Sequence, residues 1–426
     1  MAPEPNAALR LKACYPEIRF ERRKNFHIKR DTTGVARIRL SMPPRPNSPS
    51  LRTLAFYLPQ YHPIAENDEW WGAGFTEWRN VVQAKPLFKG HYQPHLPADL
   101  GFYDLRVPET REAQADLARA YGITGFCYYH YWFNGRRLLS RPFEEVFYSG
   151  RPQFPFCLCW ANESWTRKWD GLEHEVLLAQ QYSLDDDRAH MEHLLPILAD
   201  ERYVKIHGRP LLLLYRTANL PDPARTADVW RKVCLKAGLP DPYLAEVESL
   251  GHEVDPRDIG FDAAVEFAPD WKSLPPAIRH REQWDLTARL SHQLQKARLM
   301  SRAYTQHRIY SYADLSRRMQ AKPPVSYTRF RCVTPGWDNS ARRQRGANIF
   351  HGSTPDLYEQ WLEAMVADTL RNRQPEECIL FLNAWNEWAE GNHLEPDRRW
   401  GRAYLEATSR VLQAVGASGR DHAVHT

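Results

Sequence analysis

Short hydrophobic runs recur along the chain, and longer polar or amphipathic segments separate them. Continuous apolar runs of this length are typical of strands that are buried on both faces, as in parallel sheets. Eight such strands are predicted at residues 54–58, 123–131, 154–160, 210–215, 243–247, 263–267, 330–334 and 378–384. Helical spacing of apolar residues, with Pro, Asp or Gly at several ends, predicts helices at 108–122, 186–198, 223–237, 355–370 and 400–415. A basic insertion at about 275–324 is expected to be helical.

The alternation of eight strands with helices over about 360 residues fits a (β/α)8 barrel better than a doubly wound sheet. Polar and aromatic residues recur at the C-terminal end of nearly every predicted strand, and only a closed barrel brings all of these ends to one mouth. No GxGxxG or GxxxxGK[ST] follows any predicted strand, so neither a dinucleotide nor a nucleoside triphosphate cradle is visible. We therefore predict an α/β fold, a TIM barrel over residues 51–415, with a basic extension at 1–50 and a short tail at 416–426.

The net charge of +5 is unevenly distributed. Residues 1–50 hold 11 Lys and Arg against 4 Asp and Glu, whereas the remainder holds 46 against 48. The predicted barrel therefore lacks the electrostatic footprint of a nucleic-acid-binding protein. The extension ends in a Pro-rich linker at 42–49 and includes an alternating segment at 36–40 that resembles an edge strand. We interpret it as a tethered basic tail, with a docking arm or the remnant of another domain as alternatives.

Seven cysteines, an odd number, lie at scattered positions, and several are inside apolar runs. This pattern is typical of reduced thiols in a reducing compartment. No apolar run reaches the length of about 18 residues that a membrane span needs, and the N-terminus lacks an apolar signal region. We expect a cytoplasmic protein without a membrane span, and the sequence leaves its oligomeric state open.

The segment FLNAWNEWAEGNHLEP at residues 381–396 changes from an apolar run into a cluster of Trp, Asn, His and Glu. Cleavage of a glycosidic bond requires one carboxyl group to protonate the leaving oxygen and a second to support attack at the anomeric carbon. Glu387 and Glu390 are the predicted pair, and mutual repulsion beside Trp side chains is expected to raise the pKa of one of them. The alternative is a surface loop with solvated acids. Glu395 is interpreted as a supporting residue or as a salt-bridge partner near Arg398 and Arg399.

Other strand ends supply candidate sugar-binding residues. The candidate aromatic platforms are Tyr57, Tyr61, Trp71, Trp78, Trp165, Trp169 and Trp337. The remaining candidates are Glu77, His130, Trp132, Asn162, Glu163, Tyr215, Glu266, Asn386, Trp388 and His393. Each aromatic residue suits core packing as well as sugar stacking, and a lone His such as His130 is often a core residue. The pair Asn162-Glu163 repeats Asn386-Glu387, which favours a substrate-anchoring Glu over a second acid site.

Metal and cofactor signals are weak. Asp185-Asp186-Asp187 could suggest the DxD site of nucleotide-sugar transferases, but it lies at a predicted helix start, where Asp is favoured by capping and by the helix dipole. No HExxH and no Cys/His cluster at ligand spacing is present. We therefore expect no metal and no cofactor.

Five motifs in order, LAFYLPQYHPIAENDEWWGAGFTEW, GFCYYHYWFNG, CLCWANESWTRKWDG, PGWDN and WNEWAEGNHLEP, resemble those of the WbsX-type family, which is related to glycoside hydrolase family 99. The resemblance covers about residues 51–410 and implies a (β/α)8 barrel. Family 99 enzymes are retaining endo-α-mannosidases with an N-E-W-x-E motif, matched here by Asn386, Glu387, Trp388 and Glu390.

By this resemblance, Glu387 would deprotonate the 2-hydroxyl of the substrate, which then attacks the anomeric carbon and forms a 1,2-anhydro sugar. Glu390 would be the acid for the leaving group and afterwards the base for the acceptor. The residues that fall where that family contacts the sugar are Tyr57, His130, Glu163, Tyr215 and Trp337.

The leading hypothesis is a retaining, metal-independent glycoside hydrolase acting on α-linked mannose-like or 6-deoxyhexose units of a bacterial polysaccharide. WbsX-type proteins are often labelled glycosyltransferases of O-antigen or capsule synthesis, so a glycosyltransferase or transglycosylase is the first alternative. A non-catalytic glycan-binding protein is the second.

Overall fold

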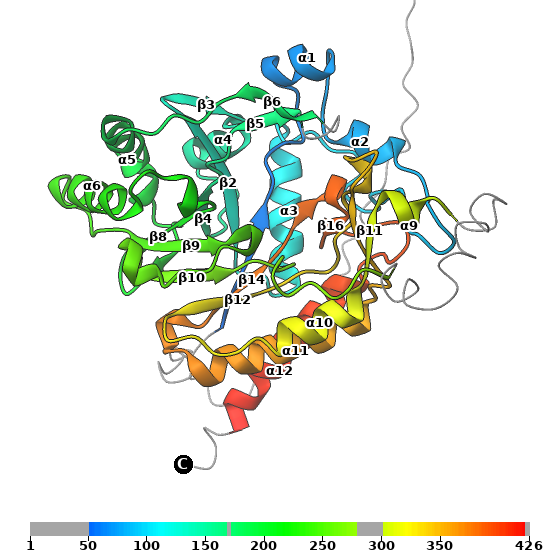
Figure 1. Cartoon of the computed structure of the whole chain (residues 1–426). Helices are drawn as coiled ribbons and strands as arrows, with labels where there is room; N and C mark the ends of the chain where they lie inside the picture. Colours follow the sequence, from blue (N-terminus) through cyan, green and yellow to red (C-terminus); the bar gives the residue numbers. More distant parts are fainter. Residues whose placement is uncertain (1–50, 168–171, 279–300, 422–426) are drawn as a thin grey trace, which may run out of the picture. The chain divides into compact units, whose positions relative to one another are not determined.

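Eight parallel strands close into a barrel in a computed structural model that describes residues 51–167, 172–278 and 301–421 (Figure 1). Each strand pairs with the next, and the last pairs with the first. In barrel order they are β1 (Arg52–Tyr57), β2 (Gly125–Phe133), β4 (Phe156–Trp160), β8 (Arg209–Leu214), β9 (Tyr243–Glu248), β10 (Ala263–Glu266), β12 (Arg329–Val333) and β14 (Ile379–Leu382). The predicted (β/α)8 fold is confirmed, with each strand within about three residues of its expected bounds.

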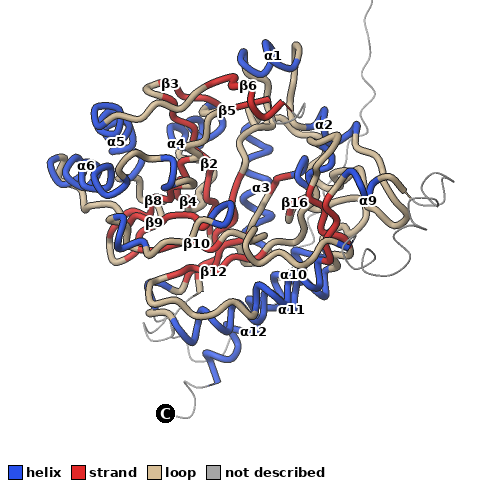
Figure 2. Tube along the Cα trace, viewed as in Figure 1, coloured by secondary structure: helices blue, strands red, loops and turns tan. Residues whose placement is uncertain are grey.

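The barrel strands are buried on both faces. In β8 and β14 every residue from Leu211 to Leu214 and from Ile379 to Leu382 is buried. Successive side chains alternate between the barrel interior and the surrounding helices. In β8 and β14 both sides are apolar, and for this reason these strands appear in the sequence as continuous hydrophobic runs. Figure 2 shows the strands inside the ring of helices.

All five predicted helices are present: α3 (Pro108–Ala120), α5 (Leu184–Leu198), α6 (Pro223–Lys236), α11 (Pro355–Asn372) and α12 (Ala403–Asp421). Proline occupies the first turn of three of them, where its missing N–H costs no hydrogen bond. The Ser183, Asp222 and Thr354 side chains cap the starts of α5, α6 and α11. One boundary is wrong: α12 continues to Asp421, so residues 416–421 belong to this helix and not to a tail.

Other elements were not predicted. Helix α4 (Arg141–Ser149) lies between β2 and β4, while two 3-10 turns, Ser249–Gly251 and Pro256–Ile259, precede β10. Long loops carry α1 (Ala65–Trp71), α2 (Trp78–Gln83), β3 (Arg136–Leu138), and the antiparallel pair β5 (Trp165–Arg167) and β6 (Leu172–Leu178). The described part of the insertion is helical in α9 (Ala303–Gln306) and α10 (Tyr312–Gln320). It also contains β11 (Arg308–Ser311), which pairs with β13 (Asn348–His351). The two-residue strand β7 (Lys205–Ile206) pairs with β8.

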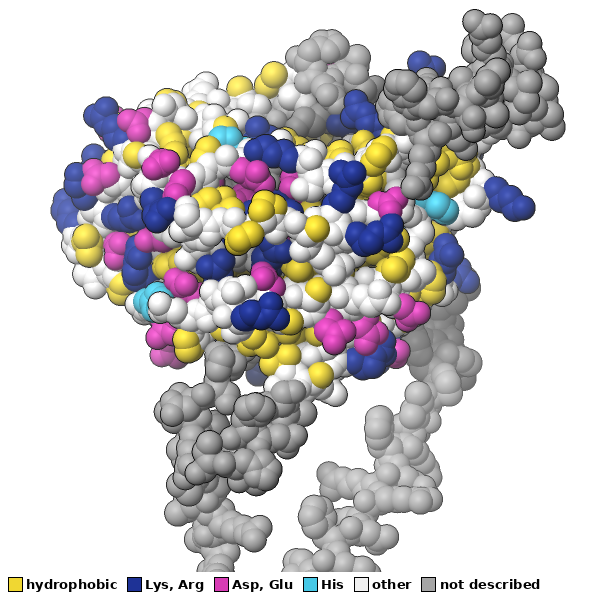
Figure 3. Space-filling view, turned by 60° about the horizontal axis from the view of Figure 1, so that its bottom comes forward, with side chains coloured by type: hydrophobic (Ala, Val, Ile, Leu, Met, Phe, Trp, Pro, Cys, Tyr) yellow, Lys and Arg dark blue, Asp and Glu magenta, His cyan; other side chains and the backbone are white. Residues whose placement is uncertain are grey.

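The extension at 1–50, its segments at 36–40 and 42–49, Trp169 and the residues after 421 lie outside the described residues. The six cysteines within the described ranges are free and buried, as expected. None of the helices in those ranges combines the length and the hydropathy that crossing a membrane requires. On the face shown in Figure 3, basic and acidic side chains are interspersed.

Helix α5 packs on alternate residues of β2. Nε2 of His130 lies 2.9 Å from Nε2 of His190, and the indole N–H of Trp132 donates to Asp186 at 2.9 Å. Because side chains alternate along a strand, Tyr129 and Tyr131 point to the other side of the sheet. His130 and Trp132 are therefore buried against α5 and not at the mouth of the barrel, which is a correction to their expected role in sugar binding.

The three Asp at 185–187 occupy the first turn of α5, which agrees with the helix-start interpretation. Asp186 accepts the Trp132 hydrogen bond, and Asp187 accepts one from the Thr226 hydroxyl at 2.7 Å. Two of the three carboxylates are thus engaged in packing α5 against its neighbours.

We predict that acid destabilises the β2–α5 contact. Burial lowers the pKa of His130 to about 3 and that of His190 well below its usual value. The unfolded chain therefore binds more protons than the folded one below pH 6.5. The free energy of unfolding should fall as the pH drops from 6.5 toward 3, by up to about 1.4 kcal/mol per pH unit for each histidine. Urea unfolding followed by Trp fluorescence at several pH values measures this slope.

The His190→Gln variant should show a shallower slope between pH 6.5 and 5, whatever its stability at pH 7. Leu235→Gln is the control, because that side chain is exposed and carries no titratable group, and it should keep the parent slope. A His190→Gln slope equal to that of the parent would contradict the prediction.

Candidate active site

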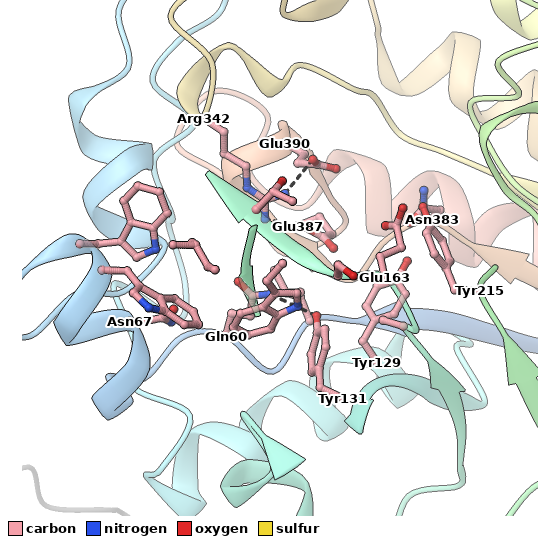
Figure 4. A pocket seen from close by; sticks show the side chains of 18 of the residues that line it. Gln60, Asn67, Tyr129, Tyr131, Glu163, Tyr215, Arg342, Asn383, Glu387 and Glu390 are labelled. Atoms are coloured by element: carbon pink, nitrogen blue, oxygen red, sulfur yellow. Dashed lines mark hydrogen bonds and ion pairs between the residues drawn. The ribbon is translucent and has the colours of Figure 1, made fainter. Parts of the chain in front are cut away.

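A cavity of about 230 Å³ lies at the C-terminal ends of the barrel strands (Figure 4). Its walls come from the ends of β1, β2, β4 and β8, from the loops after β10, β12 and β14, and from α1 and the β5–β6 pair. The residues that line it are Leu58, Gln60, Asn67, Trp70, Trp71, Tyr129, Tyr131, Ala161, Glu163, Ser164, Trp165, Thr166, Leu177, Tyr215, Phe267, Trp337, Arg342, Asn383, Glu387 and Glu390. Acidic and aromatic side chains thus meet in one enclosed space.

One guanidinium joins three carboxylates at the wall of this cavity. Nη1 of Arg342 lies 2.7 Å from Oε1 of Glu390, and Nη2 lies 3.2 Å from Oε2 of Glu387. Nε of the same side chain lies 3.0 Å from Oε2 of Glu77. Figure 4 shows Arg342 beside Glu387 and Glu390, with Glu163 and Tyr215 on another side of the cavity.

The acidity of this cluster depends on burial and on Arg342. Burial raises the pKa of Glu387 to about 8, although the Arg342 charge opposes the shift. Burial also raises the pKa of Glu77, again against Arg342. For Arg342 itself, burial lowers the pKa, but the three carboxylates outweigh it and raise the pKa well above its usual value. One carboxylate of the predicted pair was expected to have a raised pKa, and in the structure this carboxylate is Glu387.

Two asparagines make the same pair of hydrogen bonds at different places in the barrel. Oδ1 of Asn386 accepts from the Leu58 N–H at 2.7 Å, and its Nδ2 donates to the Leu58 carbonyl at 3.0 Å. Asn162 makes the equivalent bonds with Arg216, at 2.9 and 2.8 Å. Leu58 follows β1 and Arg216 follows β8, and each of these strands is the neighbour of the strand that precedes the asparagine.

The repeated Asn-Glu pair in the sequence is therefore a repeated structural device. Each asparagine fixes its loop to the next strand by both backbone groups, and the Glu that follows it, Glu163 or Glu387, lines the cavity. Glu163 also forms an ion pair with Arg216 at 3.3 Å. Asn162 and Asn386 position these acids and do not line the cavity themselves.

A buried hydrogen-bond network supports the loop that carries Glu387. The Trp388 indole N–H and the Tyr103 hydroxyl both donate to Oε2 of Glu395 at 2.7 Å, while Gln114 donates to Oε1 at 2.7 Å. The Tyr57 hydroxyl donates in turn to Gln114. Glu395 is thus a supporting residue, and the interpretation that it pairs with Arg398 or Arg399 is wrong, because its oxygens face this network in the core.

Several other candidates lie behind the cavity. The Tyr61 hydroxyl accepts from the Trp388 N–H at 3.0 Å, and the Tyr61 ring packs on Trp78. His393 stacks on Trp388 with a ring separation of 3.7 Å. These residues form the wall that supports the Glu387 loop from its far side.

Glu266 is also away from the cavity, contrary to expectation. It lies within 3.4 Å of both Lys322 and Arg331, in a buried charge cluster beside β10 and β12. The side chain is fully buried and its charge is paired there. A structural role in closing this part of the barrel follows.

The structure thus divides the predicted site residues into two groups. Those that line the cavity are Trp71, Glu163, Trp165, Tyr215, Trp337, Glu387 and Glu390. Those that do not line it are Tyr57, Tyr61, Glu77, Trp78, His130, Trp132, Asn162, Glu266, Asn386, Trp388 and His393. Within the second group, Glu77 still contacts the catalytic candidates through Arg342.

Sequence reasoning missed several residues of the cavity. Arg342 lies in the basic segment ARRQRG, where nothing in the local pattern separates it from its neighbours. Tyr129 and Tyr131 had a usable signal, since they alternate with His130 along β2. Gln60, which donates to the Tyr131 hydroxyl at 3.1 Å, and Trp70 come from loops whose geometry the sequence does not specify.

The fold and the cavity define an α/β barrel protein with acids and aromatic side chains at its C-terminal mouth. Residues 53–408 match the family model described as glycosyltransferase WbsX, and the chain belongs to this family. Two curated relatives, both named uncharacterized protein WxcX, come from Xanthomonas campestris pv. campestris strains B100 and ATCC 33913. Each is 46% identical over 359 residues, which are 84% of this chain and 49% of the relative. The chain spans about half the length of these relatives.

Solved structures share the barrel at low sequence identity. A glycoside hydrolase-like protein superposes with a TM-score of 0.54 at 12% identity, covering 85% of this chain and 94% of that one. The GH99 endo-alpha-mannosidase from Bacteroides thetaiotaomicron superposes with a TM-score of 0.50 at 14% identity, covering 87% and 98%. These similarities establish the fold.

Proposed function

We propose that the protein is a carbohydrate-active enzyme, a retaining and metal-independent glycoside hydrolase. Its substrate would be α-linked mannose-like or 6-deoxyhexose units of a bacterial polysaccharide. The observation that carries the proposal is the placement of Glu387 and Glu390 on one guanidinium, Arg342, at the mouth of a barrel and inside an aromatic cavity. Two carboxylates are the minimum set for glycosidic bond cleavage. The GH99-like fold and the WbsX family agree with chemistry on sugars.

In the proposed mechanism the sugar supplies its own nucleophile. Glu387 removes the proton of the 2-hydroxyl, and O2 attacks the anomeric carbon while the glycosidic C–O bond breaks. Glu390 donates a proton to the leaving oxygen, which gives a free sugar hydroxyl and a 1,2-anhydro intermediate. Water then attacks the anomeric carbon and loses its proton to Glu390, and Glu387 returns its proton to O2. Two inversions give overall retention.

Arg342 would orient both carboxylates and reduce the cost of ionising Glu387. It contacts Oε1 of Glu390 and Oε2 of Glu387, so the second oxygen of Glu390 is the one to present a proton to the leaving group. The positive charge of Arg342 also lowers the pKa of Glu387, which burial raises, and so favours the ionised form that a base requires. Glu77 holds the third nitrogen of the guanidinium, which fixes its direction.

Space on both sides of Glu390 suits a substrate longer than one sugar. A second cavity of about 300 Å³ shares Glu163, Tyr215, Trp337, Arg342 and Glu390 with the first and is bounded further out by Trp271 and Asn348. Sugar units on either side of the scissile bond would thus have aromatic surfaces, Trp71 and Trp165 on one side and Trp271 on the other.

Transfer to a sugar hydroxyl instead of water is the second candidate. The family description, glycosyltransferase WbsX, favours it, and the second cavity offers room for an acceptor. A transglycosylase would use the same first step and the same two carboxylates. A nucleotide-sugar donor would instead need phosphate recognition, and the sequence contains no Gly-rich phosphate motif.

We predict that Glu390→Gln and Glu387→Gln fail in different ways. Loss of the acid should lower kcat by about 10²-fold or more on natural glycosides but much less on aryl glycosides, whose leaving groups need no proton. Loss of the base should abolish turnover on both, and a 2-deoxy substrate should not react with the parent enzyme. Steady-state kinetics on the two substrate classes measures the difference.

Glu201→Gln, at an exposed position on the barrel surface, is the matched control and should keep the parent rates. Equal losses of Glu390→Gln on natural and aryl glycosides would count against the acid role. Normal turnover of a 2-deoxy substrate would exclude participation of the 2-hydroxyl.

We further predict that Arg342 sets the pH dependence. On aryl glycosides, whose leaving groups need no proton, only Glu387 must be in its active, ionised form, so kcat/KM should rise with pH through an apparent pKa near 8. Removing the opposing charge in Arg342→Gln should move this rise to higher pH, while Arg342→Lys, which keeps the charge, should move it less. An unchanged rise in Arg342→Gln would show that another group controls the profile.

A further inference from the structure

A second group of polar side chains lies on the other side of the Glu387 loop from the active-site cavity. It consists of His95, from the loop before α3, His393, from the short strand β16 (Asn392–His393), and Asp397. Nδ1 of His95 lies 3.0 Å from Nε2 of His393, and Oδ2 of Asp397 lies 3.9 Å from the same Nε2. One ligand atom from each residue falls within 4.8 Å of the others.

The facing nitrogen of His393 carries a lone pair, and Nδ1 of His95 offers one in the tautomer that has its proton on Nε2. Nδ1 of His393 is 2.9 Å from the Glu395 carbonyl and must donate to it, so Nε2 carries the lone pair in the neutral ring. Oδ1 of Asp397 accepts from the N–H groups of Arg399 and Trp400, which fixes the carboxylate. A ring N–H fixed by a backbone carbonyl is the usual support of a metal-binding histidine.

The three residues also border a cavity of about 90 Å³. Such a space holds water molecules that could complete a coordination shell. Its charged side chains are Asp338, Asp397 and Arg399, and the guanidinium of Arg399 lies over the rings of Tyr92 and Trp400, at 4.8 and 5.0 Å. Asp338 is already paired with His91 at 2.6 Å, so Asp397 is the carboxylate that faces the two histidines.

We propose that His95, His393 and Asp397 bind one divalent cation, with water in the remaining positions. Two imidazoles and one carboxylate form a donor set that suits Zn²⁺ and other first-row transition ions better than Mg²⁺. The site is separate from the carboxylate pair and does not depend on the function proposed above. No local sequence pattern indicates this site, because His95 lies about 300 positions from His393.

The cation would act as a structural brace. His393 pairs directly with Asn386 in the antiparallel β15–β16 hairpin, where β15 is Asn386–Glu387. Binding at His393 and Asp397 would hold this hairpin, and with it Glu387, to the loop of His95. The competing account is a simple hydrogen bond between two neutral imidazoles, for which no cation is needed.

Calorimetric titration of the untagged, chelator-treated chain with ZnSO₄, NiCl₂ and MgCl₂ tests the proposal. We expect one equivalent of Zn²⁺ or Ni²⁺ to bind, with weaker binding of Mg²⁺, and the melting temperature to rise with the concentration of the bound ion. Co²⁺ should give visible d–d absorption bands. Both His95→Gln and Asp397→Asn should weaken binding by about tenfold or more, and circular dichroism verifies that each is folded.

The Asp397→Asn variant keeps a side-chain oxygen that accepts from the N–H groups of Arg399 and Trp400. It therefore removes the charge with little change of the backbone at residues 397–400. His351→Gln is the control, because His351 borders the same cavity without belonging to the three, and it should bind as the parent does. Lack of saturable binding to the parent chain, or equal binding by the parent and both variants, would overturn the proposal in favour of the plain hydrogen bond.

Discussion

Three carboxylates lie close together at the edge of the cavity because a single guanidinium lies among them. Glu77, Glu387 and Glu390 would repel one another and suffer from burial without Arg342, whose three nitrogens each contact one of them. The cost of burying these charges is offset only while the cluster stays together. The loop after β12, the start of α2 and the loop after β14 are thereby held in one arrangement, and the cavity depends on all three.

A second constraint fixes where the acids point. Asn162 and Asn386 bind both backbone groups of the residue that follows the neighbouring strand. These hydrogen bonds continue the pairing of neighbouring strands beyond the regular ladder. The Glu that follows each Asn then lies on the cavity side. Glu163 and Glu387 reach the mouth by the same local geometry, and Glu387 also contacts Arg342.

The sequence specifies the barrel better than the site. Strands buried on both faces require continuous apolar runs, so β8 and β14 can be recognised in the sequence. The contact of His130 with α5 cannot, because the sequence does not show which side of β2 faces the helix. Glu387 and Glu390 were predictable because their chemistry and their position after a buried strand coincide. Arg342 was not, since its role comes from contacts with Glu77 and Glu387, which are 265 and 45 positions away. The sequence does not distinguish Trp78 from Trp165, because both are Trp residues in segments that follow predicted strands. Only the packing shows that Trp165 lines the cavity and that Trp78 lies behind it.

The central claim is that the carboxylates on Arg342 break a glycosidic bond. Incubation with purified bacterial surface polysaccharides, followed by mass spectrometry of the released saccharides, tests it most directly. We expect the parent chain to release saccharides from at least one α-linked polymer and Glu387→Gln to release none. Release by Glu387→Gln at the parent rate would contradict it, as would inertness of the parent toward every polymer combined with tight calorimetric binding of a nucleoside diphosphate.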